Sequence, residues 1–202
     1  RPIGVSDEFY KKGKAGCGHS NLAMGRGGLL GAVDMWMFDS DRRNIDRLGH
    51  RRWVINPSTK QVGFGTFGKF SAHWSLDRAR GKSTPDFDYV AYPCPGYQPM
   101  RFFKSRWAWC VSLNPKKYAA PAKGTAKATI RPAGFKFEKS PQPLELDYQN
   151  VSNAGFGVKY CIIFRPRTLP MAPGARYWVE ISGIKTKAGE DAKLEYIVEF
   201  VP

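Results

Sequence analysis

The stretch LGHRRWVINPSTKQVGFG, residues 48–65, decides how we interpret the fold of this chain. It places His50, one of three histidines, directly before an apolar run that an Asn-Pro-Ser-Thr segment at residues 56–59 interrupts. A second run follows, in which Val62 and Phe64 alternate with glycines. Apolar runs separated in this way predict a strand, a turn and a returning strand. His50 is therefore expected in a loop or helix end at the mouth of a hairpin, where side chains that meet a ligand often lie.

Further regular elements are predicted around this hairpin. Residues 29–39 place apolar side chains on one face of an amphipathic helix, which Trp36 should anchor in the core. Residues 70–76 alternate, and they predict a third antiparallel strand with Phe70 and Trp74 on an apolar face and His73 on a polar face. Residues 107–113 also predict a strand. The glycine-rich residues 1–28 and the Pro- and Gly-rich residues 78–106 are predicted to be loops, the second either functional or tied down covalently.

The C-terminal part predicts a separate β-rich unit. Residues 114–123 are interpreted as a linker. Short β-type segments then follow between Pro/Gly turns, at residues 126–131, 144–148, 158–164, 177–181 and 194–201. This spacing is typical of a small antiparallel β-sandwich of immunoglobulin or fibronectin type. We therefore expect one domain at residues 1–113, a linker at 114–123 and an immunoglobulin-like β-sandwich at 124–202.

Three motifs in order resemble the CAP superfamily, which includes cysteine-rich secretory proteins, plant pathogenesis-related proteins and bacterial relatives. Residues 48–65 resemble its Gly-His segment with the two strands that follow, residues 19–25 (HSNLAMG) stand where it carries Gly-Glu-Asn-Leu-Ala-x-Gly, and residues 32–37 (AVDMWM) stand at its tryptophan-containing helix. The resemblance covers about residues 15–113. It implies an α+β fold, with a CAP-like α-β-α sandwich that lacks its first helix here, and a secreted or envelope location. An N-terminal fragment would then be lost or stay bound as a separate chain.

The resemblance also implies a site. The family's cleft typically presents two histidines and two acidic residues that can hold a divalent cation. His50 matches the second histidine, Ser20 stands in place of a glutamate, and the first histidine has no match. His19 could partly compensate, so the implied cofactor is a weakly bound divalent metal such as zinc on His50 and His19, because tight sites need three or four ligands. In an alternative register, Arg42 replaces the family histidine.

The role of His50 stays open at this point. It can be a structural residue at a sheet edge, or a ligand or acid/base residue and thus a catalytic candidate. Ser20 and His50 could form a Ser-His-Asp triad with Asp34 or Asp39, but Ser20 lacks the tight Gly-x-Ser-x-Gly elbow that such a nucleophile needs.

Charge widens the choice of partners. The net charge is +15, with an excess of +9 over residues 1–113 and +6 over residues 114–202. Because the positive charge is spread over both halves, it indicates either a solvated basic surface or a surface that binds polyanions such as acidic glycans or anionic envelope polymers. No nucleic-acid module is recognisable, and no apolar run reaches the length of a transmembrane segment.

The four cysteines, Cys17, Cys94, Cys110 and Cys161, contain no CxxC pair, so neither a zinc knuckle nor a thioredoxin-type motif is present. Two disulfides with three connectivities are possible. Cys94 with Cys110 is favoured because the segment between them is short and irregular, and the alternative is that some or all are buried thiols.

These observations favour a binding or scaffolding component. Its expected partners are other envelope or extracellular proteins, its own N-terminal fragment, or anionic polymers. The alternative function is a metal-assisted hydrolase centred on His50.

Overall fold

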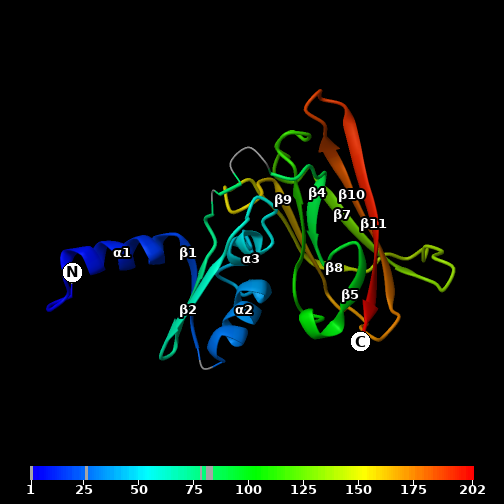
Figure 1. Ribbon diagram of the computed structural model, residues 1–202. Helices are drawn as coiled ribbons and strands as arrows, with labels where there is room; N and C mark the ends of the chain where they lie inside the picture. Colours follow the sequence, from blue (N-terminus) through cyan, green and yellow to red (C-terminus); the bar gives the residue numbers. More distant parts are fainter. Residues whose placement is uncertain (1, 26, 78, 81–83) are drawn as a thin grey trace.

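The computed structural model describes residues 2–25, 27–77, 79–80 and 84–202, and it is an α+β protein with three sheets. A small layered unit near the N-terminus lies beside a larger β-sandwich (Figure 1). The small sheet has the order β1-β3-β2, is antiparallel, and contains β1 (Ser20–Met24), β2 (Gly63–Phe67) and β3 (Phe70–Trp74). Helix α2 (Gly28–Phe38) packs on one face of this sheet, and the short α3 (Gly49–Val54) packs against α2 on the side of the sandwich (Figure 1).

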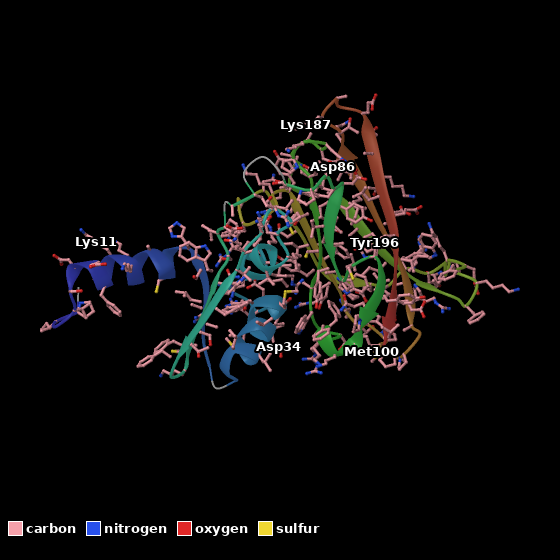
Figure 2. All side chains as sticks on the ribbon, in the orientation of Figure 1. Lys11, Asp34, Asp86, Met100, Lys187 and Tyr196 are labelled. Atoms are coloured by element: carbon pink, nitrogen blue, oxygen red, sulfur yellow. The ribbon has the colours of Figure 1, made fainter. Side chains whose placement is uncertain are left out.

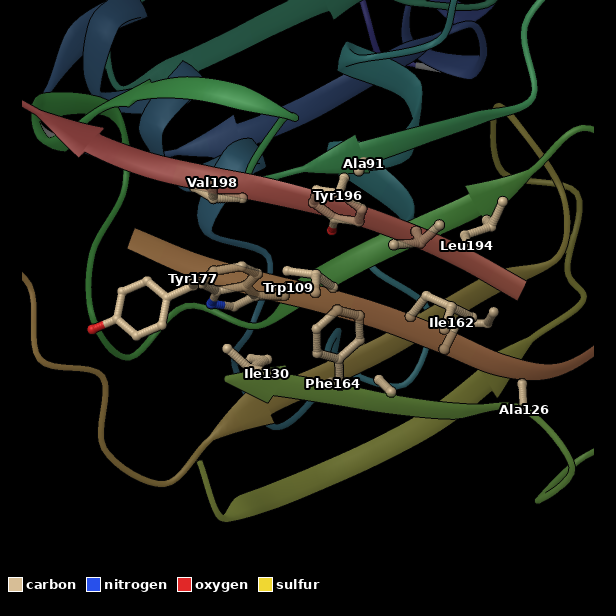
Figure 3. Packing of buried hydrophobic residues seen from close by; sticks show 14 of the residues in the cluster. Ala91, Trp109, Ala126, Ile130, Ile162, Phe164, Tyr177, Leu194, Tyr196 and Val198 are labelled. Atoms are coloured by element: carbon tan, nitrogen blue, oxygen red, sulfur yellow. The ribbon is translucent and has the colours of Figure 1, made fainter. Parts of the chain in front are cut away.

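The sandwich consists of two four-stranded sheets. One sheet has the order β5-β11-β10-β7, in which β5 (Gly96–Pro99) runs parallel to β11 (Asp191–Val201) and antiparallel pairs join β11 to β10 (Arg176–Lys185) and β10 to β7 (Lys127–Ala133). The other has the order β4-β6-β9-β8 and contains β4 (Tyr89–Tyr92), β6 (Trp109–Leu113), β8 (Leu146–Ser152) and β9 (Cys161–Pro166), all antiparallel. Between the sheets lies the main core, centred on Trp109, Phe164 and Tyr177 (Figure 3).

Several predicted elements are found in the structure. The helix expected at residues 29–39 is α2, and Trp36 is buried as predicted. The strand expected at 107–113 is β6, and the five segments expected after residue 124 correspond to β7 to β11. In β10 and β11, buried and less buried residues alternate, which is the period-two pattern of a strand with one face on a core.

The predicted boundary at residue 113 does not coincide with the sheets. Strands β4 and β6, which the sequence placed in the first domain, pair with each other, and β6 pairs with β9 of the sandwich. Residues 78–106 were predicted as a loop, yet they contain β4, β5 and a 3₁₀ turn at Met100–Phe102; residues 78 and 81–83 lie outside the described residues. Strands of four residues carry too little periodicity to recognise, and the parallel partner of β5 lies about a hundred residues away.

The predicted linker is packed against the sandwich. The Ala119 N–H donates to the Lys185 carbonyl (3.0 Å), and the Asn153 side chain donates to the Pro121 carbonyl (2.9 Å). These contacts tie the segment to β10 and to the residue that follows β8.

Near the N-terminus the structure has more order than the glycines predicted. Helix α1 (Asp7–Gly18) begins at Ser6, whose hydroxyl accepts from the Phe9 N–H (3.2 Å), and Asp7 and Glu8 place negative charge at the helix N-terminus. None of its residues is buried, and the helix projects from the body, with Lys11 in solvent (Figures 1 and 2). Of the helices in the described ranges α1 is the longest, at 12 residues, and none has the length and apolarity of a membrane span.

The first strand of the predicted hairpin is instead the helix α3. Leu48 adopts a left-handed conformation (φ 46°), and its carbonyl accepts from the Arg52 N–H (3.0 Å) to begin the helix. The turn at residues 56–59 is present, with the Thr59 N–H on the Asn56 carbonyl (3.1 Å), and β2 follows it. A three-residue apolar run does not distinguish a strand from a buried helix turn.

Strand β3 faces opposite to the expected direction. Ser71 and His73 are buried beneath α2, whereas the apolar side of the sheet is exposed to solvent. The Trp36 indole lies against the His73 ring (5.6 Å between centroids) and donates to the Leu22 carbonyl (3.1 Å). The exposed apolar face of the three-stranded sheet consists of Leu22, Met24, Phe67, Phe70 and Trp74.

Two buried arginines of α3 join the small unit to the sandwich. Arg51 donates to the carbonyls of Met37 (2.6 Å) and Phe38 (2.8 Å) at the end of α2 and to the Ala108 carbonyl at the start of β6. Its backbone thus lies in α3 while its guanidinium connects α2 to the sandwich.

Arg52 makes the second connection. It donates to the carbonyls of Arg47 (3.0 Å), Ala154 (2.6 Å) and Val158 (2.8 Å) and to the Ser152 hydroxyl (3.1 Å). The last three acceptors lie at the end of β8 and in the loop that leads to β9.

We expect Gly157→Ala to destabilise the protein by about 2–4 kcal/mol. Gly157 has φ 52°, and a Cβ there would lie 2.2 Å from the Arg52 carbonyl oxygen, so strain and overpacking add. Urea denaturation measures the change. The matched control is Gly155→Ala, where the nearest atom is 3.9 Å away and the free energy of unfolding should change by less than about 0.5 kcal/mol. Equal stabilities of the two variants would contradict this packing of the loop against α3.

Candidate functional site

His50 lies in the first turn of α3, at a cleft of about 460 Å³. The cleft is bounded by the junction of α1 and β1, by α3, and by the loop that follows β8. Seven side chains line it: Ser20, Asn21, Arg47, His50, Trp53, Leu76 and Phe156. The His50 side chain is 38% exposed, so its ring is neither sealed in the core nor fully in solvent.

Asp39 holds the His50 ring in place. The Asp39 side chain is 1% exposed, and its Oδ1 lies 2.8 Å from Nδ1 of His50. Its Oδ2 accepts from the backbone N–H groups of His50 (2.9 Å) and Arg51 (3.3 Å) at the start of α3. Asp39 ends α2 in a left-handed conformation (φ 36°), which turns its carboxylate toward α3. Since Nδ1 donates to Asp39, Nε2 is the ring nitrogen that can meet a ligand.

The same hydrogen bond raises the pKa of His50 above 6.5, against the opposing effects of burial and of the Arg47 charge. His50 therefore keeps its proton to a higher pH than a free imidazole. Because the pKa of His50 is raised in the folded state, the Asp39–His50 contact stabilises the fold while His50 is protonated. This stabilisation is fully present below pH 6.5 and is lost as the pH rises through the folded-state pKa. Burial beneath α2 has the opposite effect on His73, whose pKa is lowered.

Ser20 and Asn21 attach strand β1 to the helices around the cleft. The Ser20 hydroxyl donates to the Gly16 carbonyl (2.7 Å), and the Asn21 side chain donates to the His50 carbonyl (2.9 Å). Within the described part of the chain, no hydrogen bond joins Ser20 to His50. The triad considered from the sequence is thus reduced to its Asp39–His50 half, and the other aspartate considered, Asp34, is exposed on α2 (Figure 2).

His19 does not join His50. Its Nδ1 lies 2.8 Å from the Ala15 carbonyl, its ring stacks on Trp74 (5.1 Å between centroids, 9° between planes), and it is not among the residues that line the cleft. Among the described residues, no group of three or more His, Cys, Asp or Glu side chains could hold a metal ion. The lining offers one imidazole and no carboxylate, so the residues present do not fit the divalent metal that the resemblance implies.

The favoured disulfide between Cys94 and Cys110 is not formed, and all four cysteines are free thiols. Cys94 is exposed after β4, where its sulfur lies near the Tyr97 carbonyl (3.6 Å), whereas Cys110 is buried in β6. The hydrogen bond from the buried Cys161 thiol and the nearby Arg51 guanidinium lower the pKa of Cys110. The sheet register, which the sequence could not supply, brings Cys110 toward Cys161.

Sequence reasoning missed part of the site. Asp39 was considered only as one of two triad aspartates. The Asp39-Ser40-Asp41 run after a helix nevertheless indicates a turn in which a carboxylate accepts from nearby backbone N–H groups. Arg47 gave no signal beyond its charge. Phe156 comes from the expected β-sandwich, outside the residues that the family resemblance covers, and only the packing of the β8–β9 loop on α3 brings it to the cleft.

Comparisons with protein-family models, curated proteins and solved structures find no match to this chain. The CAP resemblance therefore stays a prediction from motifs.

Asp39→Asn should lower the pKa of His50, because the neutral amide removes the charge that stabilises the imidazolium. Asn tolerates the left-handed conformation at this position, so the helix end is retained. NMR titration of the imidazole Cε1 protons measures the change, with His73 as an internal reference. The control Asp34→Asn should leave His50 unchanged, and an unchanged His50 pKa in Asp39→Asn would contradict the assigned contact.

Proposed function

We propose that this protein is a binding or scaffolding component of the extracellular space or cell envelope, and that its His50 cleft binds an anionic group of the partner. One observation carries the proposal: of the described residues that line the cleft, the ionisable ones are Arg47 and His50, and none is Asp or Glu. A site of this composition attracts negative charge and repels cations.

The two cationic groups suit different parts of an anion. His50, with its raised pKa, offers an Nε2–H donor that keeps its charge to a higher pH than a free imidazole, while Arg47 offers a forked guanidinium that matches carboxylate, phosphate or sulfate oxygens. Trp53 and Phe156 add apolar surface beside these donors. The arrangement favours an anionic group on a larger organic molecule over a small inorganic ion.

The rest of the surface supports the same function. A net charge of +15 increases the local concentration of anionic polymers, most strongly at low ionic strength. The exposed apolar face of the three-stranded sheet supports protein partners as well, since contiguous apolar patches often mark interaction surfaces. Envelope or extracellular proteins and anionic envelope polymers thus remain the proposed partners.

A hydrolase centred on His50 is the second candidate. The 2.8 Å contact between Asp39 and His50 favours it, because a buried carboxylate on Nδ1 orients an imidazole for general acid–base chemistry. The donor set does not fit a metal, so this candidate would act through His50 alone. Turnover that is lost in His50→Gln would favour the enzyme, whereas binding without turnover favours the first proposal.

Binding of poly(vinyl sulfonate) tests the anion site. The charge of this probe does not change between pH 5 and 9, so we expect its affinity to fall as the pH rises and His50 loses its proton. Calorimetric titration should show His50→Gln and Arg47→Gln each weakening binding about tenfold at low pH, as loss of a charged hydrogen bond implies. His50→Gln should also remove the pH dependence.

Arg43→Gln is the matched control. It removes the same charge from an exposed residue outside the cleft, so it should reduce affinity only slightly. If Arg43→Gln and Arg47→Gln have equal effects, binding is a property of the overall charge and the cleft is not the anion site.

A further inference from the structure

A second hollow, of about 480 Å³, lies on the outer face of the β5-β11-β10-β7 sheet. The other sheet of the sandwich packs its outer face against Ile45 and Leu48 of the small unit, which places this hollow on the far side of the sandwich from the His50 cleft (Figure 1). We call this hollow the aromatic groove. The side chains that line it include Tyr97, Phe137, Trp178, Ile197 and Glu199.

Strand register builds the floor of the aromatic groove. Tyr97 of β5, Glu199 of β11 and Arg176 of β10 are direct neighbours in one row across three strands. In the next row on the same face, Ile197 pairs with Trp178. An aromatic ring, a carboxylate and a guanidinium thus lie side by side above a mostly apolar floor.

The loop between β7 and β8 supplies the second wall. It projects from the sandwich (Figure 1, yellow-green, right) and returns so that the Trp178 indole donates to the Phe137 carbonyl (2.7 Å). This bond holds Phe137 in a left-handed conformation (φ 63°), which is costly for an aromatic residue and typical of positions with a role in binding. The walls are open to solvent, because Tyr97 is 71% and Phe137 47% exposed.

The charges around the aromatic groove are already balanced. Arg176 makes a two-point ion pair with Glu199 (2.7 and 3.1 Å), and Lys139 pairs with Glu195 while its ammonium lies 4.6 Å from the Trp178 ring centre. Arg176 keeps the pKa of Glu199 low, so the carboxylate stays ionised and retains lone pairs for further hydrogen bonds. The groove therefore carries no excess charge that would select a charged ligand, in contrast to the His50 cleft.

We propose that the aromatic groove binds a neutral glycan. The C–H face of a pyranose ring is slightly electropositive and apolar, and it stacks on the negative face of an exposed aromatic ring such as Tyr97. Its hydroxyl groups donate to the Glu199 carboxylate, which lines the groove. The Glu199 and Glu195 carboxylates would repel a uronate or sulfate group, because their partner cations neutralise them without leaving excess positive charge. This inference concerns a site separate from the proposed anion cleft and does not depend on it.

Calorimetric titration of the full chain with two neutral probes, cellohexaose and chitohexaose, tests the proposal. We expect at least one hexamer to bind, Tyr97→Ala to weaken that binding about tenfold, as loss of a stacking ring implies, and Tyr97→Trp to retain it. Phe67→Ala is the matched control, because this ring is 87% exposed on the three-stranded sheet and does not line the groove; its affinity should stay within about twofold of the unmodified protein.

Three results would overturn the proposal. The first is that neither hexamer binds at millimolar concentration, and the second is that Tyr97→Ala binds as well as Phe67→Ala. The third is that His50→Gln abolishes binding, which would place the glycan in the cleft. Because Tyr97 is exposed, thermal unfolding should be unchanged in Tyr97→Ala, and that measurement separates loss of binding from loss of fold.

Discussion

The structure depends on two adjacent arginines that are buried without a carboxylate partner among the described residues. Arg51 and Arg52 are 0% and 1% exposed, and their guanidinium groups are surrounded by main-chain carbonyls. A buried charge is costly unless hydrogen bonds replace its water, and a guanidinium has five donors to satisfy. Carbonyls at the end of α2, just before β6 and in the loop after β8 supply the acceptors, and the carbonyls at the end of α2 have no partner within the helix. The arginines therefore fix several chain ends at once, which explains how a six-residue helix can join two layers.

The candidate site is a consequence of this arrangement. Arg51 holds the last turn of α2 against α3, and Asp39, which ends α2, then accepts from the first N–H groups of α3 and from the His50 ring. On the next residue, Arg52 draws in the loop after β8, which brings Phe156 to the other side of the cleft. His50 thus owes its position and its raised pKa to contacts that the neighbouring arginines make possible. Consecutive residues of a helix point in different directions, so one turn of α3 places the histidine and the two arginines in three different surroundings.

Sequence reasoning found the elements with long, regular patterns. Helix α2 and strands β7 to β11 were predicted because their apolar spacing extends over enough residues to be distinctive. His50 was expected in a loop or helix end at the mouth of a hairpin, and it lies in the first turn of α3. The orientation of β3 was not predictable, because alternation shows that a strand has two different faces without showing which one a helix covers. Here Trp36 packs on His73, and the apolar face is left exposed. The parallel pairing of β5, the α3 helix and the Asp39–His50 contact depend on partners that no local pattern contains. For the same reason the boundary at residue 113 divided the sandwich.

The two proposed binding sites differ in a way that bears on how one chain could hold a composite polymer. In the His50 cleft, the buried Asp39 already pairs with His50, so Arg47 supplies the unmatched positive charge, and the affinity for an anion should weaken with salt. In the aromatic groove each cation has a carboxylate partner, and the exposed surface is aromatic, so its affinity should depend on ring stacking and change little with salt. A polymer with both anionic groups and neutral sugar rings could use both sites, and each would then raise the effective concentration of the polymer at the other. Linked weak sites of this kind suit a scaffold, because avidity comes from geometry and neither site needs the enclosed, many-ligand surroundings of a catalytic centre.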